Sequence, residues 1–439
     1  MNKTFYIETY GCQMNVVDSE IVTSILIEAG YKLVEDIKEA NILLLNTCAI
    51  REKAVERVIN KMKHHKSLKN TGKLEIAGVL GCIPEHTGDE LRSKLDFIKL
   101  QVGPDKYRTL PELLKKIYKE DKYLEELDFD IAENYDDVAP YRSENTNAFI
   151  SVMRGCNNYC SYCVVPYVRG REKSRSIDSI IAEVEQTLAN GISEITLLGQ
   201  NVNSYNFEGI RFPELLQKVA EVKGMRRLKF ATSHAKDLSE ELIDVIVKNE
   251  NISNSFHLPF QAGSNEVLKN MNRGYTIEEY LAKIDMIREK LPDIAITTDV
   301  IVGFPGETNE DFEKTIKVLK DTEFDNAFMF IYSERKNTMS AKKFKDDVSK
   351  EEKGRRQQVI SELQKEIGLE QLRKDIGKTK EVLIESVSKK RDDQYKGRTD
   401  ENRIVIFDKK ENCNIGGFVK VKIIKAEGVT LFGEIVNKL

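Results

Sequence analysis

Apolar residues recur along the chain with two different periods, and each period predicts a different kind of domain. Up to about residue 376, short apolar runs alternate with stretches in which apolar residues recur every three or four positions. Strands that alternate with amphipathic helices form parallel sheets. From about residue 377 the period changes to two, which predicts antiparallel strands. We therefore expect an α/β multidomain protein with a small all-β tail.

Residues 1–119 predict four β/α units, which make a small doubly wound α/β domain. Its helices are expected over Asp18–Gly30, Arg51–Lys69 and Tyr107–Tyr118. The alternation resumes over residues 145–376, where a β/α barrel is expected, with strands at FISVMR, EITLLG, RLKFATS, SFHLPF, AITTDVIVG and NAFMFIYS. Residues 377–439 predict a small antiparallel barrel.

The charge distribution is more informative than the net charge of −4. The segment from Lys119 to Asp137 has nine acidic residues against two basic ones and shows no clear period. Residues 120–144 are therefore expected to form an acidic linker. From Gly377 onward there are 14 Lys and Arg against 10 Asp and Glu. This weakly basic tail is the better candidate for contact with phosphate.

Three cysteines in RGCNNYCSYCVVPYVRG, Cys156, Cys160 and Cys163, have CxxxCxxC spacing, and Tyr162 directly precedes the last of them. This spacing gives three irons of a four-iron cluster one thiolate each and leaves the fourth iron open. The alternative is a zinc site. Zinc prefers four closed ligands from paired CxxC knuckles, and no His or fourth Cys lies nearby in the sequence. An iron–sulfur cluster is therefore favoured.

Three further cysteines, Cys12, Cys48 and Cys82, each directly follow an apolar strand-like run. Because loops after parallel strands gather at one edge of a sheet, these cysteines are expected to converge on a second cluster with an open iron. The alternative is that each is an ordinary buried cysteine. The seventh cysteine, Cys413, lies in the turn-like segment ENCNIGG and is expected to be structural or incidental.

Together the two triplets resemble those of the radical S-adenosylmethionine methylthiotransferases. The resemblance runs nearly end to end and includes ETYGCQMN, LNTCAIREKA, GCIPE, RGCNNYCSYCVVPYVRGREKSR, LLGQNVNSY, HLPFQAGS and DVIVGFPGET. It implies a partial (β/α)6 barrel and a transferase with two four-iron clusters and S-adenosylmethionine (SAM) as methyl donor and radical source. The tail resembles the TRAM domain, an RNA-binding barrel.

Within the family, NTCAIREKA and VVPYVRGREKSR favour methylthiolation of C2 of N6-(dimethylallyl)adenosine next to the anticodon of tRNA. The C2–H bond is not acidic enough for base catalysis. The resemblance implies that SAM is cleaved at the Cys156 triplet to a 5′-deoxyadenosyl radical, and that the Cys12 triplet delivers sulfur methylated by a second SAM. The alternatives are a threonylcarbamoyladenosine tRNA substrate, an aspartate of a ribosomal protein, or a non-catalytic iron–sulfur RNA-binding protein.

Further site residues are expected at the ends of barrel strands and in the tail. The resemblance implies SAM contacts at Tyr162, Gly199, Gln200, Asn201, His234, Gln261 and Gly303. Contacts with tRNA are expected at Lys389, Lys390, Arg391, Arg398 and Arg403. One segment departs from the family: Tyr332–Ala341 reads YSERKNTMSA where relatives read YSPRPGTPA. The absent Pro-Gly predicts a different course for that loop.

The expected setting is the cytoplasm, because the chain shows no signal-peptide pattern and no apolar run of about 20 residues. Its cysteines are then expected to be thiols and metal ligands rather than disulfides. The expected partners are tRNA, an external electron donor and a sulfur source, and the protein is expected to be a monomer without membrane contact.

Overall fold

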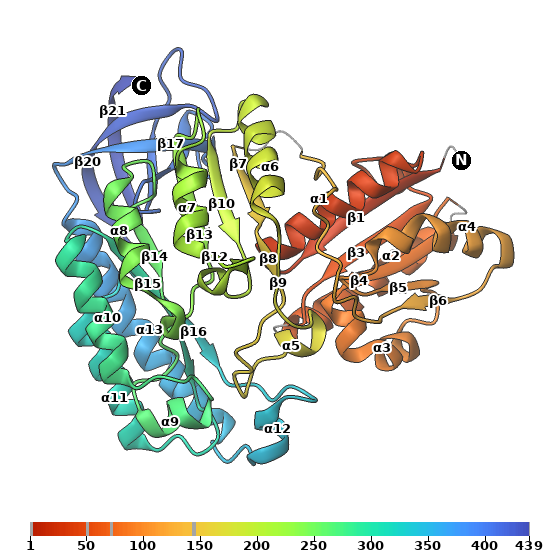
Figure 1. Ribbon diagram of the computed structural model, residues 1–439, viewed down its shortest axis with the longest axis horizontal. Helices are drawn as coiled ribbons and strands as arrows, with labels where there is room; N and C mark the ends of the chain where they lie inside the picture. The colour runs from red at the N-terminus through yellow and green to blue at the C-terminus, as the bar shows by residue number, and fades with distance from the viewer. Residues whose placement is uncertain (1–2, 50–51, 71–72, 143–145, 439) are drawn as a thin grey trace.

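The computed structural model describes residues 3–49, 52–70, 73–142 and 146–438. In Figure 1 the N-terminal domain lies at the right, the β/α barrel in the centre and the all-β tail at the upper left. The predicted helix start at Arg51 and the predicted boundary at residues 144 and 145 lie outside the described residues. No helix within the described ranges is both long and apolar enough to cross a membrane.

A parallel six-stranded sheet forms the N-terminal domain, in the order β2-β1-β3-β4-β5-β6. Every residue of β3 and β4 is buried, as expected for parallel strands covered on both faces. The prediction of a doubly wound domain is therefore confirmed. The strands are β1 (Thr4–Tyr10), β2 (Lys32–Leu33), β3 (Ile42–Thr47), β4 (Ile76–Gly81), β5 (Leu100–Val102) and β6 (Leu124–Glu126), and the helices are α1 (Gln13–Glu28), α2 (Glu52–Asn70), α3 (Cys82–Lys94) and α4 (Leu110–Glu120).

The acidic segment is more structured than the predicted linker. It supplies β6 to the sheet and buries Tyr135, whose hydroxyl donates to the Pro104 carbonyl at 2.9 Å and accepts from the Tyr107 amide at 3.0 Å. The prediction of a linker is wrong at these positions. A three-residue strand is too short to show a period, and two tyrosines among nine acidic residues give little signal.

The central domain contains the six predicted strands in two parallel sheets, β7-β10-β13 and β14-β15-β16, which meet where Leu228 bridges Ile252. The strands are β7 (Asn147–Ser151), β10 (Glu194–Leu198), β13 (Arg227–Ala231), β14 (Ser255–His257), β15 (Ala295–Val302) and β16 (Asn326–Ile331). They are covered by α6 (Ile177–Ala189), α7 (Phe212–Ala220), α8 (Glu240–Lys248), α10 (Ile277–Lys290), α11 (Asn309–Thr322) and α13 (Lys350–Arg373). The partial barrel is confirmed.

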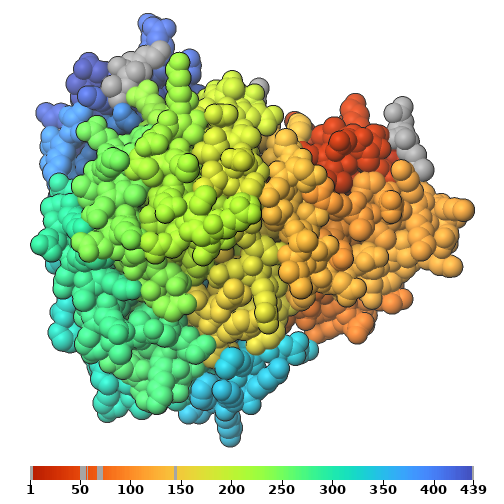
Figure 2. Space-filling model, in the orientation of Figure 1, coloured from red at the N-terminus to blue at the C-terminus, as the bar shows by residue number. Residues whose placement is uncertain are grey.

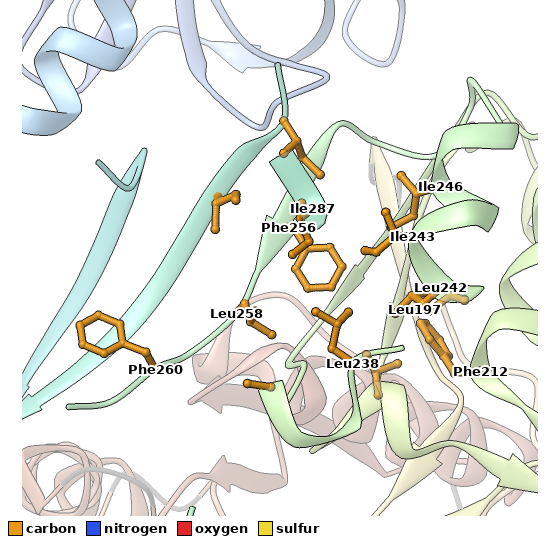
Figure 3. Packing of buried hydrophobic residues seen from close by; sticks show 14 of the residues in the cluster. Leu197, Phe212, Leu238, Leu242, Ile243, Ile246, Phe256, Leu258, Phe260 and Ile287 are labelled. Carbon is orange, nitrogen blue, oxygen red and sulfur yellow. The ribbon is translucent and has the colours of Figure 1, made fainter. Parts of the chain in front are cut away.

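Apolar side chains fill the space between the strands and the surrounding helices. Figure 3 shows Leu242, Ile243 and Ile246 of α8 near Phe212 of α7, with Phe256 of β14 on the strand side. Residues three and four apart share one helical face, which explains why this stripe of α8 is buried. The helices therefore hold the strands, whose carboxyl ends carry the site described below.

The tail is a closed barrel of strands in the order β17-β18-β19-β21-β20. Its strands are β17 (Thr379–Val387), β18 (Gln394–Thr399), β19 (Ile404–Asp408), β20 (Phe418–Glu427) and β21 (Thr430–Lys438). The predicted antiparallel pairing holds for every neighbouring pair except β19 and β21, which are parallel. Cys413 is buried in this barrel's core, which agrees with a structural role.

The tail docks at the amino ends of the central strands. Arg403 forms ion pairs with Asp325, just before β16, and with Asp375. The Asp400 carboxylate accepts a hydrogen bond from the Asn254 amide, just before β14, at 2.8 Å. Arg227, the first residue of β13, lies over the Phe418 ring at 4.9 Å from its centroid. The tail and the carboxyl-end loops therefore lie at opposite ends of the barrel.

Candidate active site and auxiliary cysteine site

Cys156, Cys160 and Cys163 lie in one loop after β8 (Met153–Arg154) and before α5 (Val165–Val168). The Cys163 amide donates to the Cys160 carbonyl at 2.9 Å, which curls the loop. Gly155 has φ +76, and a Cβ there would lie 2.0 Å from the Arg171 carbonyl oxygen, so the entry to the loop requires glycine. The thiols of the three cysteines interact electrostatically and thus lie together.

Two buried basic side chains, Arg273 and His234, adjoin the Cys160 thiol. Arg273 Nη1 lies 3.3 Å from Cys160 Sγ and 3.4 Å from the Tyr162 hydroxyl, so it donates toward both. His234 Nε2 lies 4.0 Å from the same sulfur, while its Nδ1 accepts from the Lys236 amide at 3.1 Å. Burial is the larger cause and the charge of Arg273 the second, and together they lower the pKa of His234 to about 2. The ring is therefore neutral, and its proton is on Nε2, toward the sulfur.

Burial dominates the electrostatics of this triplet. It raises the pKa of Cys156 to about 11 and that of Cys163 to about 12, because the loss of hydration disfavours the thiolate. A cluster bound here would be shielded from water by the same burial.

Several buried side-chain oxygens at the carboxyl ends of the strands have no hydrogen-bond partner among the described residues. They belong to Gln200, Asn201, Ser233 and Gln261, in the loops after β10, β13 and β14. Buried polar atoms normally have partners, so these acceptors indicate a polar ligand with ammonium or hydroxyl donors. SAM has both. The residues present therefore fit the cofactor, and three of the four were predicted to contact it.

Two glycines predicted to contact the cofactor have different surroundings. A Cβ at Gly199 would lie 2.6 Å from Met153 Cγ, so glycine allows the loop after β10 to approach the cysteine loop. The Gly303 amide donates to the Glu307 carboxylate, and another amide of that turn, of Gly306, donates to Asp347 at 2.8 Å. These amides are thus used within the chain, and contact of Gly303 with SAM stays a prediction.

Cys12, Cys48 and Cys82 lie at the carboxyl ends of β1, β3 and β4, beside the point where the strand order reverses. The Cys12 thiol is hydrogen-bonded with Cys48 and interacts electrostatically with Cys82, so the three converge as predicted. Gly11 allows this approach, because a Cβ there would lie 2.5 Å from Cys48 Cβ.

Two asparagines with no exposed surface tie these loops together. Asn15 Nδ2 donates to Asn46 Oδ1 at 3.0 Å and to the Thr47 carbonyl at 3.1 Å, and Asn46 Nδ2 donates back to the Asn15 carbonyl at 2.9 Å. The Asn15 side-chain oxygen accepts from the Cys12 thiol at 3.4 Å. A satisfied buried network of this kind rigidifies its surroundings.

A cation from the central domain, Arg169, reaches this second triplet. The hydrogen bond with Cys48, and then Arg169, lower the pKa of Cys12 to about 6 against the opposing effect of burial. Burial raises the pKa of Cys82, although Arg169 acts in the opposite direction. Arg169 is itself held by Asp18 of α1, at 2.7 Å. No local pattern in the sequence indicated a role for Asp18 or Arg273, and the family-like segment VVPYVRG was the only signal for Arg169.

The loop that departs from the family lies between the barrel and the N-terminal domain. Lys336 forms an ion pair with Glu90 of α3 at 2.9 Å, and Figure 2 shows the segment around α12 (Met339–Lys343) meeting the N-terminal domain at the lower edge. Asn337 has φ +71, the left-handed conformation that glycine favours and asparagine tolerates.

The predicted RNA-binding residues fall into two groups. Lys389, Lys390 and Arg391 are exposed in the turn between β17 and β18. Arg403 is taken up by the ion pairs that dock the tail, and Arg398 pairs with Glu385 at 2.9 Å. The first group is therefore the more exposed of the two, although Arg391 pairs with Asp393, and RNA contact at all five positions stays a prediction.

The described part of the chain contains no group of three or more His, Cys, Asp or Glu side chains arranged for a metal ion. A four-iron cluster places each thiolate on a separate iron, so its ligands need not surround one point. Assignment of clusters to the two triplets therefore depends on the cysteine spacing and on the relatives of the chain.

A cysteine triplet at the carboxyl end of a partial β/α barrel defines a radical SAM protein. The family described as the Radical SAM superfamily matches residues 150–319, the uncharacterized protein family UPF0004 matches residues 4–103, and the TRAM domain matches residues 373–436. Membership of the superfamily implies one four-iron cluster and SAM.

Similar chains cover nearly all of this one. A protein of Parabacteroides distasonis named tRNA-2-methylthio-N(6)-dimethylallyladenosine synthase is 46% identical to this chain, over 99% of this chain and 96% of the relative. A protein of the same name from Pelodictyon phaeoclathratiforme is 47% identical to this chain, over 98% of both. The chain belongs to the family of these synthases.

Solved structures support the fold alone. The radical SAM methyltransferase TsrM from Kitasatospora setae aligns with a TM-score of 0.60 at 15% identity, over 77% of this chain and 75% of that one. The cobalamin-dependent SAM radical enzyme OxsB aligns with a TM-score of 0.55 at 15% identity, over 77% of this chain and 54% of that one.

Proposed function

We propose that this chain transfers a methylthio group to C2 of N6-(dimethylallyl)adenosine next to the anticodon of tRNA. The observation that carries the proposal is the identity of 46–47% to synthases of that name over nearly the full length of both chains. The converging Cys12, Cys48 and Cys82 support it, because insertion of sulfur requires a sulfur-bearing site besides the one that cleaves SAM.

Each triplet is proposed to hold one four-iron cluster. When bound, the two clusters would supply the electron that cleaves SAM and the sulfur that is transferred. The buried oxygens of Gln200, Asn201, Ser233 and Gln261 are proposed to accept hydrogen bonds from SAM and so orient it. Arg273 and the neutral His234 would stabilise the Cys160 sulfur.

The proposed macromolecular partner is tRNA, bound in part by the tail. Lys389, Lys390 and Arg391 are exposed and free of buried ion pairs, which suits them to phosphate contact. An external electron donor and an external sulfur source are also proposed, for a monomer acting in the cytoplasm.

Anaerobic reaction of the reconstituted protein with SAM, a reductant and tRNA that carries dimethylallyladenosine tests the proposal. Digestion and nucleoside mass spectrometry should show a methylthio addition to that nucleoside. The matched control is the protein with Cys12, Cys48 and Cys82 changed to Ala. Modification of threonylcarbamoyladenosine instead, or no nucleoside product from protein that still cleaves SAM, would contradict the proposed substrate.

A further inference from the structure

Buried charges at the junction of the N-terminal domain and the barrel do not balance. Asp18 is completely buried on α1, and its two carboxylate oxygens accept from Arg154 Nη2 at 2.6 Å and from Arg169 Nη2 at 2.7 Å. Both arginines belong to the central domain, and both are almost fully buried. One carboxylate therefore faces two guanidinium groups.

The neighbouring carboxylates do not supply the missing negative charge. Lys173 and Asp105 form their own pair at 2.7 Å, which is neutral. Burial, and then Asp105, raise the pKa of Glu85 to about 8, so this carboxyl is mostly protonated at neutral pH. With the cysteine sulfurs left out of the count, the described residues of the junction thus hold one excess positive charge. An unpaired buried charge is costly, so an anion is expected at the cysteine sulfurs that Arg169 faces.

The excess charge lies next to the auxiliary cysteines. Arg169 interacts with the thiols of both Cys12 and Cys82. Its side chain is hydrogen-bonded with the Cys82 thiol, and its buried Nη1 has no oxygen or nitrogen acceptor among the described residues. A buried N–H without an acceptor is uncommon in a folded protein. An anionic sulfur at the triplet would satisfy both the unpaired donor and the unbalanced charge.

We propose that Arg169, held by Asp18, donates a hydrogen bond to an anionic sulfur at the Cys12–Cys48–Cys82 site and makes the group bound there easier to reduce. The proposal depends on the auxiliary cluster proposed above. The sulfur is either a sulfide of the cluster or a sulfur ligand on its open iron. Because Arg169 belongs to the central domain, the auxiliary site is complete only when the two domains are docked.

The test uses protein in which Cys156, Cys160 and Cys163 are changed to Ala, so that only the auxiliary cluster gives a signal. In this background Arg169→Gln is compared with Arg169→Lys, by redox titration followed by electron paramagnetic resonance, with and without added sodium sulfide. The Gln variant retains a neutral pair of Asp18 with Arg154 and should fold. The control is Arg175→Gln, another buried arginine of the central domain, which pairs with Asp136 and Glu183.

Arg169→Gln should lower the equilibrium constant for reduction at least tenfold, a fall of about 59 mV for one electron. Arg169→Lys should retain most of the potential, and Arg175→Gln should leave it unchanged. A fall without sulfide identifies a cluster sulfide as the acceptor, and a fall only with sulfide identifies the ligand on the open iron. Asp18→Asn provides an opposite test, because loss of a negative charge should raise the potential.

An unchanged potential in the Arg169→Gln protein under both conditions, with normal auxiliary iron, would overturn the role of Arg169. The same holds if Asp18→Asn leaves the potential unchanged or lowers it. Loss of the remaining iron, about four atoms, from the background protein itself would instead overturn the auxiliary cluster. The two failures are therefore distinguishable.

Discussion

Both cysteine triplets are buried beside an arginine, Arg273 in one and Arg169 in the other, but the balance between burial and charge differs. In the loop of Cys156, Cys160 and Cys163, burial dominates, and the pKa of Cys156 is raised to about 11. At the sheet edge, a hydrogen bond with Cys48 and the charge of Arg169 lower the pKa of Cys12 to about 6. The first triplet lies within one loop, whereas the second is assembled from three loops and completed by the neighbouring domain.

This difference suits two different tasks. A buried loop keeps water and stray hydrogen donors away from a reactive radical. A cation beside the cysteines at the sheet edge favours a negatively charged sulfur there.

The largest effect is expected from removal of the radical triplet. Changing Cys156, Cys160 and Cys163 to Ala should reduce formation of 5′-deoxyadenosine to background, because no cluster remains to cleave SAM. Iron should fall from about eight atoms to about four. Iron analysis and chromatography after anaerobic reconstitution check this, with Cys413→Ala as the control. Full retention of iron would contradict the assignment.

Removal of the auxiliary triplet should abolish methylthio transfer and leave the cleavage of SAM intact. With Cys12, Cys48 and Cys82 changed to Ala, 5′-deoxyadenosine should still form, while methylthio-nucleosides in tRNA disappear. Both products can be measured in one reaction. If methylthio-nucleosides formed at the normal rate, this triplet would be structural.

The thiols of the metal-free protein should differ in reactivity. At pH 7 Cys12 is mostly thiolate, whereas only about one in 10⁴ Cys156 side chains is ionised. Since nucleophilicity falls with pKa, alkylation of Cys12 should be about fiftyfold faster. Its rate should level off above pH 7, while that of Cys156 continues to rise beyond pH 9. Peptide mass spectrometry checks this; equal rates under native conditions would remove the contrast.

Loss of the hydrogen bond between Arg273 and Cys160 should slow the cleavage of SAM. A hydrogen bond to a charged group contributes about 1.5–3 kcal/mol, so Arg273→Lys should slow formation of 5′-deoxyadenosine about tenfold or more. Arg211→Lys is the control, because Arg211 is exposed on the outside of the barrel and pairs with Glu241. Equal rates in the two variants would show that Arg273 only supports the fold.

The smallest effect is expected at the exposed turn of the tail. Changing Lys389, Lys390 and Arg391 to Gln should lower the slope of log affinity for tRNA against log salt by up to about three units. Cleavage of SAM without tRNA should be unaffected. Lys317→Gln with Lys320→Gln on α11 is the matched control. An unchanged slope would place the RNA contacts elsewhere.

Local patterns in the sequence predicted much of the fold. The barrel strands, both triplets and an all-β tail were predicted. Apolar runs and the CxxxCxxC spacing are local signals, whereas the family resemblance supplied the number of barrel strands, and the topology of parallel sheets supplied the convergence of Cys12, Cys48 and Cys82. The buried ion pairs were not. Asp18 lies 136 residues from Arg154 and 151 from Arg169, so no local pattern links them. The sequence alone does not distinguish a charged residue that becomes buried from one that stays on the surface.

The predicted role of Arg403 illustrates the same limit. Its position in a basic tail favoured phosphate contact, but the fold brings it against Asp325 and Asp375. Strand β6 shows a second limit, because three residues in an acidic segment carry too little apolar signal to indicate a strand. The sequence therefore predicts elements well and their mutual contacts poorly.

The docking of the tail also fixes the distance between the tail and the cysteine loop. Arg227 and Arg403 fasten the small barrel to one end of the central strands, while the cysteine loop occupies the other end. An RNA held by the tail as proposed would therefore have to present its target nucleoside at a set distance from the bound backbone. A stem that is too short or too long would then bind without bringing the nucleoside to the cysteine loop.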